Sequence, residues 1–473
     1  MKPARSVILL VPLLAASCTA FRPEDRPPAE AAGMPAAYTG PAGEAALSNR
    51  WWEAFGSAEL NGLVETALAR NFSIAQADAR LRQARALARQ AGAALWPAVT
   101  AEAGARTVER ETEGVGQTAR DTYDIGLAAS YELDLWGRVR SSRRAAALDA
   151  AAAELDLATA AMTLSAEVVL RYLELLEARQ TRAVLEEQAA TNRKTLELIE
   201  LRFKRGRATA LDVLQQREIL VRSESLLPLQ RGREQTLLSA LAVLQGRAPG
   251  ENPNLAGAAL PAMPAFPETG LPADLLARRP DLRAAWTRLR AAEWSGAAAR
   301  ADRLPAFRIT AGAGYENETV STLFDNWILN LAGNLSAPLA DGGRRRAEVA
   351  RRAAVVDERL AAYRATALAA LRDVHDAVAL ETVQAEALAA ARKQLALAVA
   401  ARERAFDRYG KGQESYLRVL SAITNEQSLR RALVEAERLH LAYRVQLYRA
   451  LGGDWITVLH TTRAHRENNG TPP

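Results

Sequence analysis

Two long stretches of the chain, residues 138–205 and 344–409, contain neither proline nor glycine. Alanine, leucine, glutamate and arginine dominate both, and all four are good helix formers. In the first stretch, apolar residues recur every three or four positions, as at Leu157, Leu164 and Tyr172, with charged residues between them. At ~1.5 Å per residue, each stretch predicts a helix of roughly 100 Å. Such lengths far exceed the mean of ~11–12 residues, so we expect coiled-coil-like packing rather than an ordinary globular core.

The chain repeats itself at a nearly constant offset. Matched residues lie 208 positions apart before the second hairpin loop and 206 apart after it: Pro97 and Pro305, Gly104 and Gly312, Gly206 and Gly412, Gly246 and Gly452. We therefore expect two repeats, 57–260 and 261–455, each consisting of helix, β-hairpin, long helix, tight turn and helix. The predicted helices are 57–96, 138–205 and 209–245 in the first repeat and 272–304, 344–410 and 415–451 in the second, with hairpins at 98–135 and 306–338.

The two hairpins are predicted from a change of period. Residues 124–135 alternate between apolar side chains at odd positions and mostly polar ones at even positions, and residues 307–316 and 327–337 do the same. Residues 109–121 and 317–326 are expected to be loops. Four strands cannot close a barrel in lipid, where an open edge leaves backbone groups unpaired. Several copies must then contribute strands; the alternative is a soluble β-sandwich on a helical stalk.

The N-terminus predicts export and lipid attachment. Lys2 and Arg5 precede an apolar segment, residues 7–14, that is too short to span a bilayer, so residues 1–17 are typical of a signal peptide. The sequence Leu14-Ala15-Ala16-Ser17-Cys18 resembles a bacterial lipobox. Cys18 is the only cysteine and cannot form an intramolecular disulfide, which favours acylation. A plain secretory signal with an incidental cysteine is the alternative. Residues 18–56 are expected to form a lipidated linker, and residues 456–473 a C-terminal tail.

Several function classes are disfavoured by the residues. The net charge of +6 is small for 473 residues, and the arginines are spread through glutamate-rich helices, so we expect no nucleic-acid partner. The chain has four histidines, and His375 with Asp376 is interpreted as a surface pair within a helix. Neither a metal-ligand spacing nor a phosphate loop nor a nucleophile elbow is present. We therefore predict no enzymatic activity, no metal site and no cofactor.

The order of several short motifs resembles the TolC-like outer-membrane efflux channels, specifically the lipoprotein branch exemplified by OprM and CusC. The resemblance covers about residues 14–455 and rests on these motifs: Trp51-Trp52 with Phe55, Tyr131-Glu132-Leu133-Asp134-Leu135-Trp136-Gly137-Arg138, Arg202-Phe203 with Gly206, Leu211-Asp212-Val213-Leu214, Leu275-Leu276-Ala277-Arg278-Arg279-Pro280-Asp281, Pro338-Leu339 with Asp341-Gly342-Gly343-Arg344, and Arg408-Tyr409 with Gly412.

That resemblance implies a mixed fold of all-α coiled coil and membrane β structure. It implies a homotrimer with a 12-stranded β-barrel continued by a long periplasmic α-barrel. It also implies a place in the bacterial outer membrane as the passive exit duct of a tripartite efflux system for drugs or other small molecules. The partners would be outer-membrane lipid, a periplasmic adaptor protein and an inner-membrane pump of the RND type. A protein-secretion duct of type I and a periplasmic coiled-coil scaffold lipoprotein without a pore are the alternatives.

By the same resemblance, the turns at the far ends of the long helices are the periplasmic tips. Adaptor docking is expected at Gly206, Thr209, Gly412 and Gln413. The gate is expected to involve Asp212, Arg207, Tyr409, Glu414, Leu417, Arg418 and Ser421. The family carries aspartates where this chain has Arg418 and Ser421, so Asp212 remains the candidate gate acid.

Overall fold

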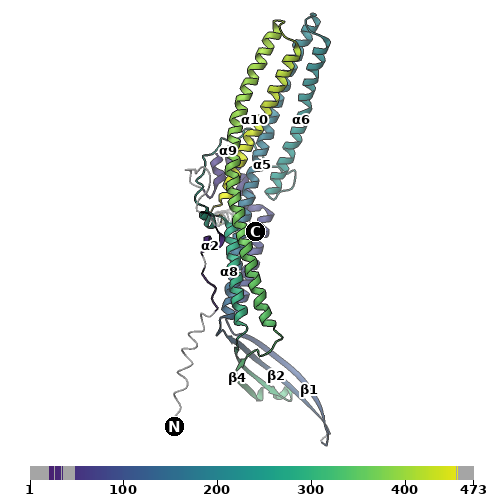
Figure 1. The fold of residues 1–473 in the computed structure, drawn as a ribbon. Coiled ribbons are helices and arrows are strands. Elements are labelled where there is room, and N and C mark those ends of the chain that lie inside the picture. Colours follow the sequence, from purple (N-terminus) through teal and green to yellow (C-terminus); the bar gives the residue numbers. More distant parts are fainter. Residues whose placement is uncertain are drawn as a thin grey trace. The chain divides into compact units, whose positions relative to one another are not determined.

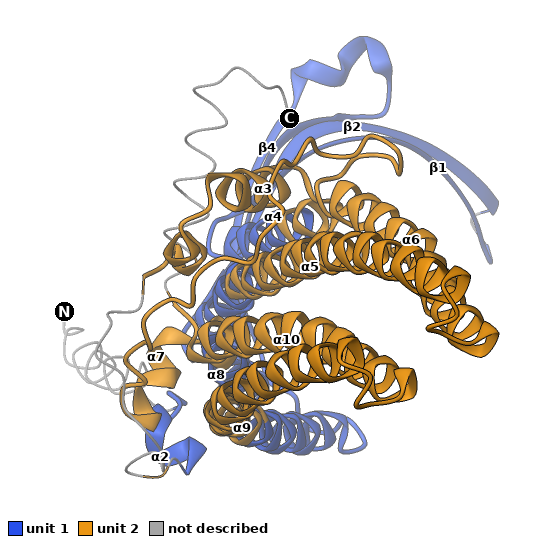
Figure 2. Ribbon diagram, turned by 90° about the horizontal axis from the view of Figure 1, so that it is seen from above, with its two compact units in different colours: residues 1–33, 79–154, 283–365 blue, residues 34–78, 155–282, 366–473 orange. Residues whose placement is uncertain are grey.

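The computed structural model describes residues 21–25, 27–33, 35, 48–114, 116–453 and 455. The predicted signal peptide, Cys18 and the tail after residue 455 lie outside these residues. Two compact units, each built from three separate segments, are distinguished by colour in Figure 2. Unit 1 comprises Met1–Gly33, Ala79–Glu154 and Arg283–Ala365; unit 2 comprises Met34–Asp78, Leu155–Leu282 and Thr366–Pro473.

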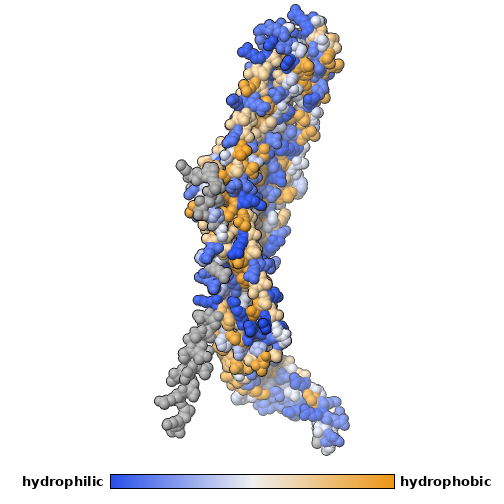
Figure 3. Space-filling model, in the orientation of Figure 1, coloured by the Kyte–Doolittle hydropathy of each residue, from blue (hydrophilic) through white to orange (hydrophobic). Residues whose placement is uncertain are grey.

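The two long helices are confirmed: α5 (Arg138–Lys204) and α9 (Arg344–Gly410) each contain 67 residues without interruption. After each of them the chain turns and returns in α6 (Ala210–Leu244) or α10 (Tyr416–Leu451), as Figure 1 shows. The remaining helical elements are α2 (Pro28–Ala32), η1 (Trp51–Phe55), α3 (Ala58–Arg70), α4 (Phe72–Ala93), η2 (Pro272–Asp274), α7 (Leu275–Arg278) and α8 (Pro280–Ala301). None of the helices in the described ranges is both long enough and apolar enough to cross a bilayer. On the face drawn in Figure 3, hydrophilic and hydrophobic residues are interspersed along them.

The predicted helices 57–96 and 272–304 are wrong in one respect, because each is divided. Asn71 takes an extended conformation between α3 and α4, and its side-chain oxygen accepts a hydrogen bond of 2.8 Å from the backbone N–H of Ser73. Arg279 is extended between α7 and α8 because the following residue, Pro280, disfavours a helical conformation in the residue before it. The two interruptions lie at equivalent positions in the two repeats.

The duplication extends to packing in unit 2. Gly246, after α6, has a φ of 72°, and a Cβ there would lie 2.5 Å from the carbonyl oxygen of Arg70. Gly452, after α10, has a φ of 84°, and a Cβ there would lie 2.7 Å from the carbonyl oxygen of Arg278. In both repeats the end of the last helix therefore approaches the end of the first so closely that only glycine fits.

Unit 1 contains one antiparallel sheet with the strand order β1-β2-β3-β4. The strands are β1 (Ala98–Thr112), β2 (Gly116–Leu133), β3 (Ala306–Asn317) and β4 (Trp327–Ser336). The expected loop at residues 109–121 is wrong, because pairing continues out to Thr112 and Gly116. Polar side chains exposed on both faces do not prevent backbone pairing, and the Thr107 hydroxyl supports it by donating to Asp121 at 2.8 Å. The second loop holds a short 3₁₀ helix, η3 (Val320–Asp325).

Where all four strands pair, the register gives the sheet one apolar and one polar face. Residues paired directly across strands share a face, so Ala101, Leu127, Ala313 and Leu329 form one apolar row across all four strands. Three polar residues, Glu132, Arg308 and Asn334, form a row on the opposite face. The alternation predicted within single strands is thus aligned over the full width of the sheet.

Candidate functional site

The two turns that join α5 to α6 and α9 to α10 have the same backbone geometry. Gly206 has a φ of 68° and Gly412 a φ of 74°. The N–H of Arg207 donates to the carbonyl of Arg202 at 2.8 Å, and that of Gln413 to the carbonyl of Arg408 at 2.9 Å. A left-handed glycine followed by this bond is the usual way to satisfy the last carbonyls of a helix. Both turns lie at the same end of unit 2 (Figure 1).

The starts of the returning helices differ. Thr209 and Asp212 form a capping box: the Thr209 hydroxyl accepts from the Asp212 N–H at 3.1 Å, and the Asp212 carboxylate accepts from the Thr209 N–H at 2.8 Å. At the matching position of the second repeat, Arg418 cannot accept a hydrogen bond, and Ser415 makes no side-chain cap bond. Asp212, the predicted gate acid, therefore has a local structural role in the single chain.

The other predicted gate residues lie around the turns without forming one cluster within the chain. Arg207 is exposed. The carboxylate oxygens of Glu414 lie 3.7 Å from a guanidinium nitrogen of Arg408 and 3.9 Å from one of Arg418. The predicted residues that are exposed on α10 are Leu417, Arg418 and Ser421, and the predicted docking residues Gly206, Thr209, Gly412 and Gln413 are also exposed.

Tyr409 is the predicted gate residue that the structure places in a core. It packs with Tyr416, Val419 and Ile423, and its ring centre lies 5.3 Å from that of Tyr416. The Arg202 guanidinium lies over the Tyr409 ring, 4.5 Å from its centre. Burial, together with the nearby negative charge of Asp212, raises the pKa of the Tyr409 hydroxyl above its ordinary value of 10.0. The hydroxyls of Tyr409 and Tyr416 are therefore both protonated and neutral at physiological pH.

Tyr416 also belongs to a buried hydrogen-bond network that the sequence analysis did not predict. Its members are Asn192, Gln216, Ser223, Tyr416 and Gln427. The Tyr416 hydroxyl donates to the side-chain oxygen of Gln216, whose amide donates to the Asn192 carbonyl at 2.9 Å. The Asn192 amide donates to the Ser223 hydroxyl at 2.7 Å, and Gln427 donates to the Asn192 side chain at 2.9 Å. Asn192 and Gln216 are fully buried.

This network joins α5, α6 and α10, so it fixes how the two helical hairpins of unit 2 meet near their turns. Buried polar side chains in coiled coils set register because a slipped arrangement would leave them unpaired. The sequence signal that could have revealed this network was an amide side chain at an apolar position of the helical repeat. That signal does not say which helix supplies the partner.

Among the residues that the structure describes, no group of three or more His, Cys, Asp or Glu side chains is arranged to hold a metal ion. The helical hairpins of unit 2 and the sheet of unit 1, with its apolar row across all four strands, are features of one class of protein, the membrane channels. Within it, the chain belongs to the outer membrane efflux protein family, whose model matches residues 63–247 and 271–453. The two matches coincide with the two repeats, and the family consists of channel proteins rather than enzymes.

Relatives and solved structures agree with this assignment. The pyoverdine export outer membrane protein OpmQ of Pseudomonas aeruginosa is 34% identical over 420 residues, covering 86% of this chain and 87% of the relative. The outer membrane protein OprJ of the same species is 31% identical over 476 residues, covering 96% and 97%. The structure of the outer-membrane channel OprN matches with a TM-score of 0.86 at 29% identity, covering 93% of this chain and all of that one. The TolC-like resemblance, the fold class and the efflux function are confirmed.

Proposed function

We propose that three copies of this chain, anchored by an acylated Cys18, form the exit duct of a tripartite efflux system. In this arrangement a periplasmic adaptor and an inner-membrane pump of the RND type deliver the cargo, and the duct conducts it passively. The names of the relatives support small molecules as cargo, since they include a pyoverdine exporter and, in Pseudomonas putida, the solvent efflux pump protein SrpC.

The observation that carries the proposal is the sheet of unit 1. Strands β1 and β4 each pair with a single strand among the described residues, so the sheet has two open edges. One of its faces is apolar over its whole width, and Leu329 and Leu331 on that face are 70% and 78% exposed in the single chain. In lipid, unpaired backbone groups cost several kcal/mol each. Closing β4 of one copy onto β1 of the next removes both edges and leaves the polar face toward water.

Neighbouring residues of β4 test this orientation directly. We expect Leu331→Lys to destabilise the assembled protein by about 2–4 kcal/mol per chain, because it places a charge on the lipid face. Asn330→Lys places the same charge on the opposite face, so it should assemble normally. The measurement is the yield and thermal stability of trimers reconstituted in lipid bilayers. Equal tolerance of both substitutions would contradict the proposed orientation, and a monomer without ion conductance in planar bilayers would contradict the channel.

Adaptor docking at the turns is supported by apolar side chains that face solvent there. Leu211 on α6 and Leu417 on α10 occupy equivalent positions in the two repeats and are 60% and 61% exposed. They flank the polar turn residues Thr209 and Gln413, which are also exposed. Apolar residues rimmed by polar ones are typical of a protein-binding surface, and the repeat presents this surface twice per chain.

We place the gate at the same turns, formed where Asp212, Arg207, Tyr409 and Glu414 of the three copies converge with the exposed α10 residues Leu417, Arg418 and Ser421. The buried hydrogen-bond network holds each α10 in its closed position. This chain has Arg418 where the family has an aspartate. Three copies therefore place a ring of positive charges at the gate.

Removal of the Tyr416 hydroxyl tests the contribution of the buried network to the gate. Tyr416→Phe leaves the buried side-chain oxygen of Gln216 without its donor, a change that costs about 1–3 kcal/mol. We therefore expect a higher open probability in single-channel recordings and hydrogen exchange at least about fivefold faster at the start of α10. Ser428→Ala is the control, because the exposed Ser428 hydroxyl on the same helix donates to the Asn425 carbonyl of that helix at 2.8 Å and takes no part in the network. Equal behaviour of the two variants would remove the network from the gate.

A further inference from the structure

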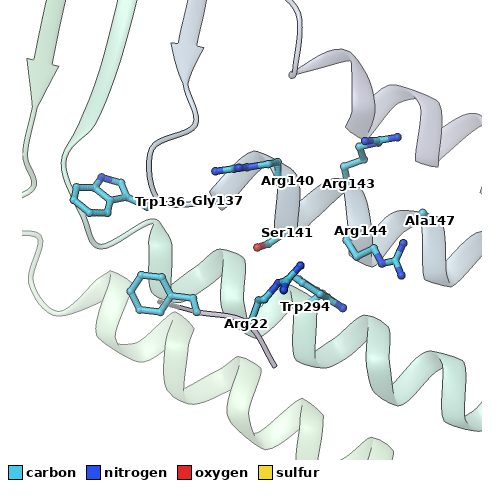
Figure 4. Close-up of a pocket in the computed structure, with 10 residues that line it drawn as sticks. Arg22, Trp136, Gly137, Arg140, Ser141, Arg143, Arg144, Ala147 and Trp294 are labelled. Atoms are coloured by element: carbon cyan, nitrogen blue, oxygen red, sulfur yellow. The ribbon is translucent and has the colours of Figure 1, made fainter. Parts of the chain in front are cut away.

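Unit 1 contains a cavity that the channel function does not use. It has a volume of about 520 Å³ and lies where the chain leaves the sheet and enters α5. Its lining includes Arg22 from the N-terminal segment, Arg140, Arg143 and Arg144 from the first turns of α5, and two tryptophans, Trp136 and Trp294 (Figure 4). No acidic side chain lines it.

The arginines of this cavity are not equivalent. Arg140 is held by Asp134, donating to its carboxylate at 3.1 Å and to its backbone carbonyl at 2.8 Å. Arg22, Arg143 and Arg144 have no carboxylate within ion-pair distance among the residues that the structure describes. In Figure 4, Arg22 lies beside Trp294, Arg144 extends from α5 on the side of Ala147, and Arg140 and Arg143 point to opposite sides. Arg22 and Arg144 thus line the same cavity, and neither guanidinium group is paired with a carboxylate of the described residues.

The position of the cavity relates it to the membrane. The Trp136 indole N–H donates to the Pro305 carbonyl at 2.7 Å, which ties the residues after β2 to those before β3 at the end of the sheet. Arg22 follows Cys18 by only four residues (22 − 18), a span of at most roughly 14 Å when fully extended. If Cys18 carries acyl chains, as the proposed function requires, this cavity lies at the lipid surface. Tryptophan is enriched at that level of membrane proteins.

We propose that this cavity binds the phosphodiester headgroup of an anionic phospholipid from the periplasmic leaflet of the outer membrane. Arg22 and Arg144 donate to the phosphate oxygens, an arrangement that suits the planar, forked guanidinium group. The two tryptophans cover the glycerol and the upper acyl chains. This inference rests on the proposed lipid anchoring. A bound lipid would hold the N-terminal segment against α5 and α8 and so align the anchor with the sheet.

Native mass spectrometry of the full-length lipoprotein tests the proposal, with added palmitoyl-oleoyl phosphatidylglycerol as the probe. The control lipid is the diacylglycerol with the same acyl chains, which lacks the phosphodiester. We expect one tightly held phosphatidylglycerol per chain and none of the diacylglycerol. In the double variant Arg22→Gln/Arg144→Gln, the affinity should fall about tenfold or more. Arg89→Gln removes one exposed charge of α4 outside the cavity and should bind like the wild type.

Three outcomes would overturn the proposal. The first is equal phosphatidylglycerol binding by the wild type and the double variant. The second is displacement of the lipid by excess inorganic phosphate, which would assign the cavity to a free anion. The third is a double variant that binds lipid normally and fails to trimerise, which would show that the arginines pair with a neighbouring copy. Trimer yield and ion conductance are recorded on the same samples, so loss of lipid binding with retained conductance separates this inference from the channel itself.

Discussion

Gly246→Ala is expected to prevent assembly of the channel. The glycine combines a φ of 72° with a Cβ position only 2.5 Å from the carbonyl oxygen of Arg70. The left-handed conformation alone costs about 1–2 kcal/mol for a residue with a side chain. The clash adds to that, because the contacting atom belongs to the backbone and cannot rotate away. Relief requires moving the end of α3 or α6, which also breaks the hydrogen bond of 2.8 Å from Asn71 to the Leu244 carbonyl.

Gly206→Ala is the matched control, because it separates the conformational cost from the steric one. Gly206 has a φ of 68°, and no atom lies within 4 Å of a Cβ placed there. We expect this variant to form trimers and to lose only about 1–2 kcal/mol, confined to the turn. The measurements are trimer yield in membranes and thermal unfolding followed by circular dichroism. If the two variants behaved alike, the close approach at Gly246 would not matter for folding.

The second large effect concerns Arg444 on α10, whose charge is buried. Arg444 and Glu381 are each only 3% exposed, and the guanidinium Nε lies 3.0 Å from a Glu381 carboxylate oxygen. The same guanidinium donates to the carbonyls of Pro264 and Ala265, in the segment that connects α6 to η2. Arg444→Leu leaves the Glu381 carboxylate buried without a partner, so we expect a loss of about 3–5 kcal/mol.

The double variant Arg444→Leu/Glu381→Leu shows whether the isolated charge is responsible. Replacing both partners removes the uncompensated carboxylate, and we expect most of the lost stability to return. The two connecting carbonyls remain without donors, so recovery should be incomplete. Thermal unfolding of the three proteins measures both effects. A double variant as unstable as Arg444→Leu would show that the carbonyl contacts, rather than the ion pair, hold the connecting segment.

Local chemistry explains why much of the fold was predictable. The helical repeat, the tight turns at Gly206 and Gly412 and the strand alternation are properties of a few neighbouring residues, and all three are present in the structure. The errors have local causes as well. Polar residues that still pair as strands concealed the outer part of the first hairpin, and a single extended residue, Asn71, divided a helix that its neighbours favour.

The sequence by itself determined the two repeats, the long helices, the faces of the strands and the family, because each rests on periodicity and on the spacing of matched residues. Only the tertiary structure decided which polar groups meet. Tyr416 and Gln216 are 200 residues apart, and Arg444 lies 63 residues from Glu381 and 180 from Pro264. The position of a side chain in the sequence pattern shows whether it is buried, but not which distant group forms its hydrogen bond or ion pair. That choice arises when the helices pack, because a buried donor or acceptor without a partner is too costly to remain.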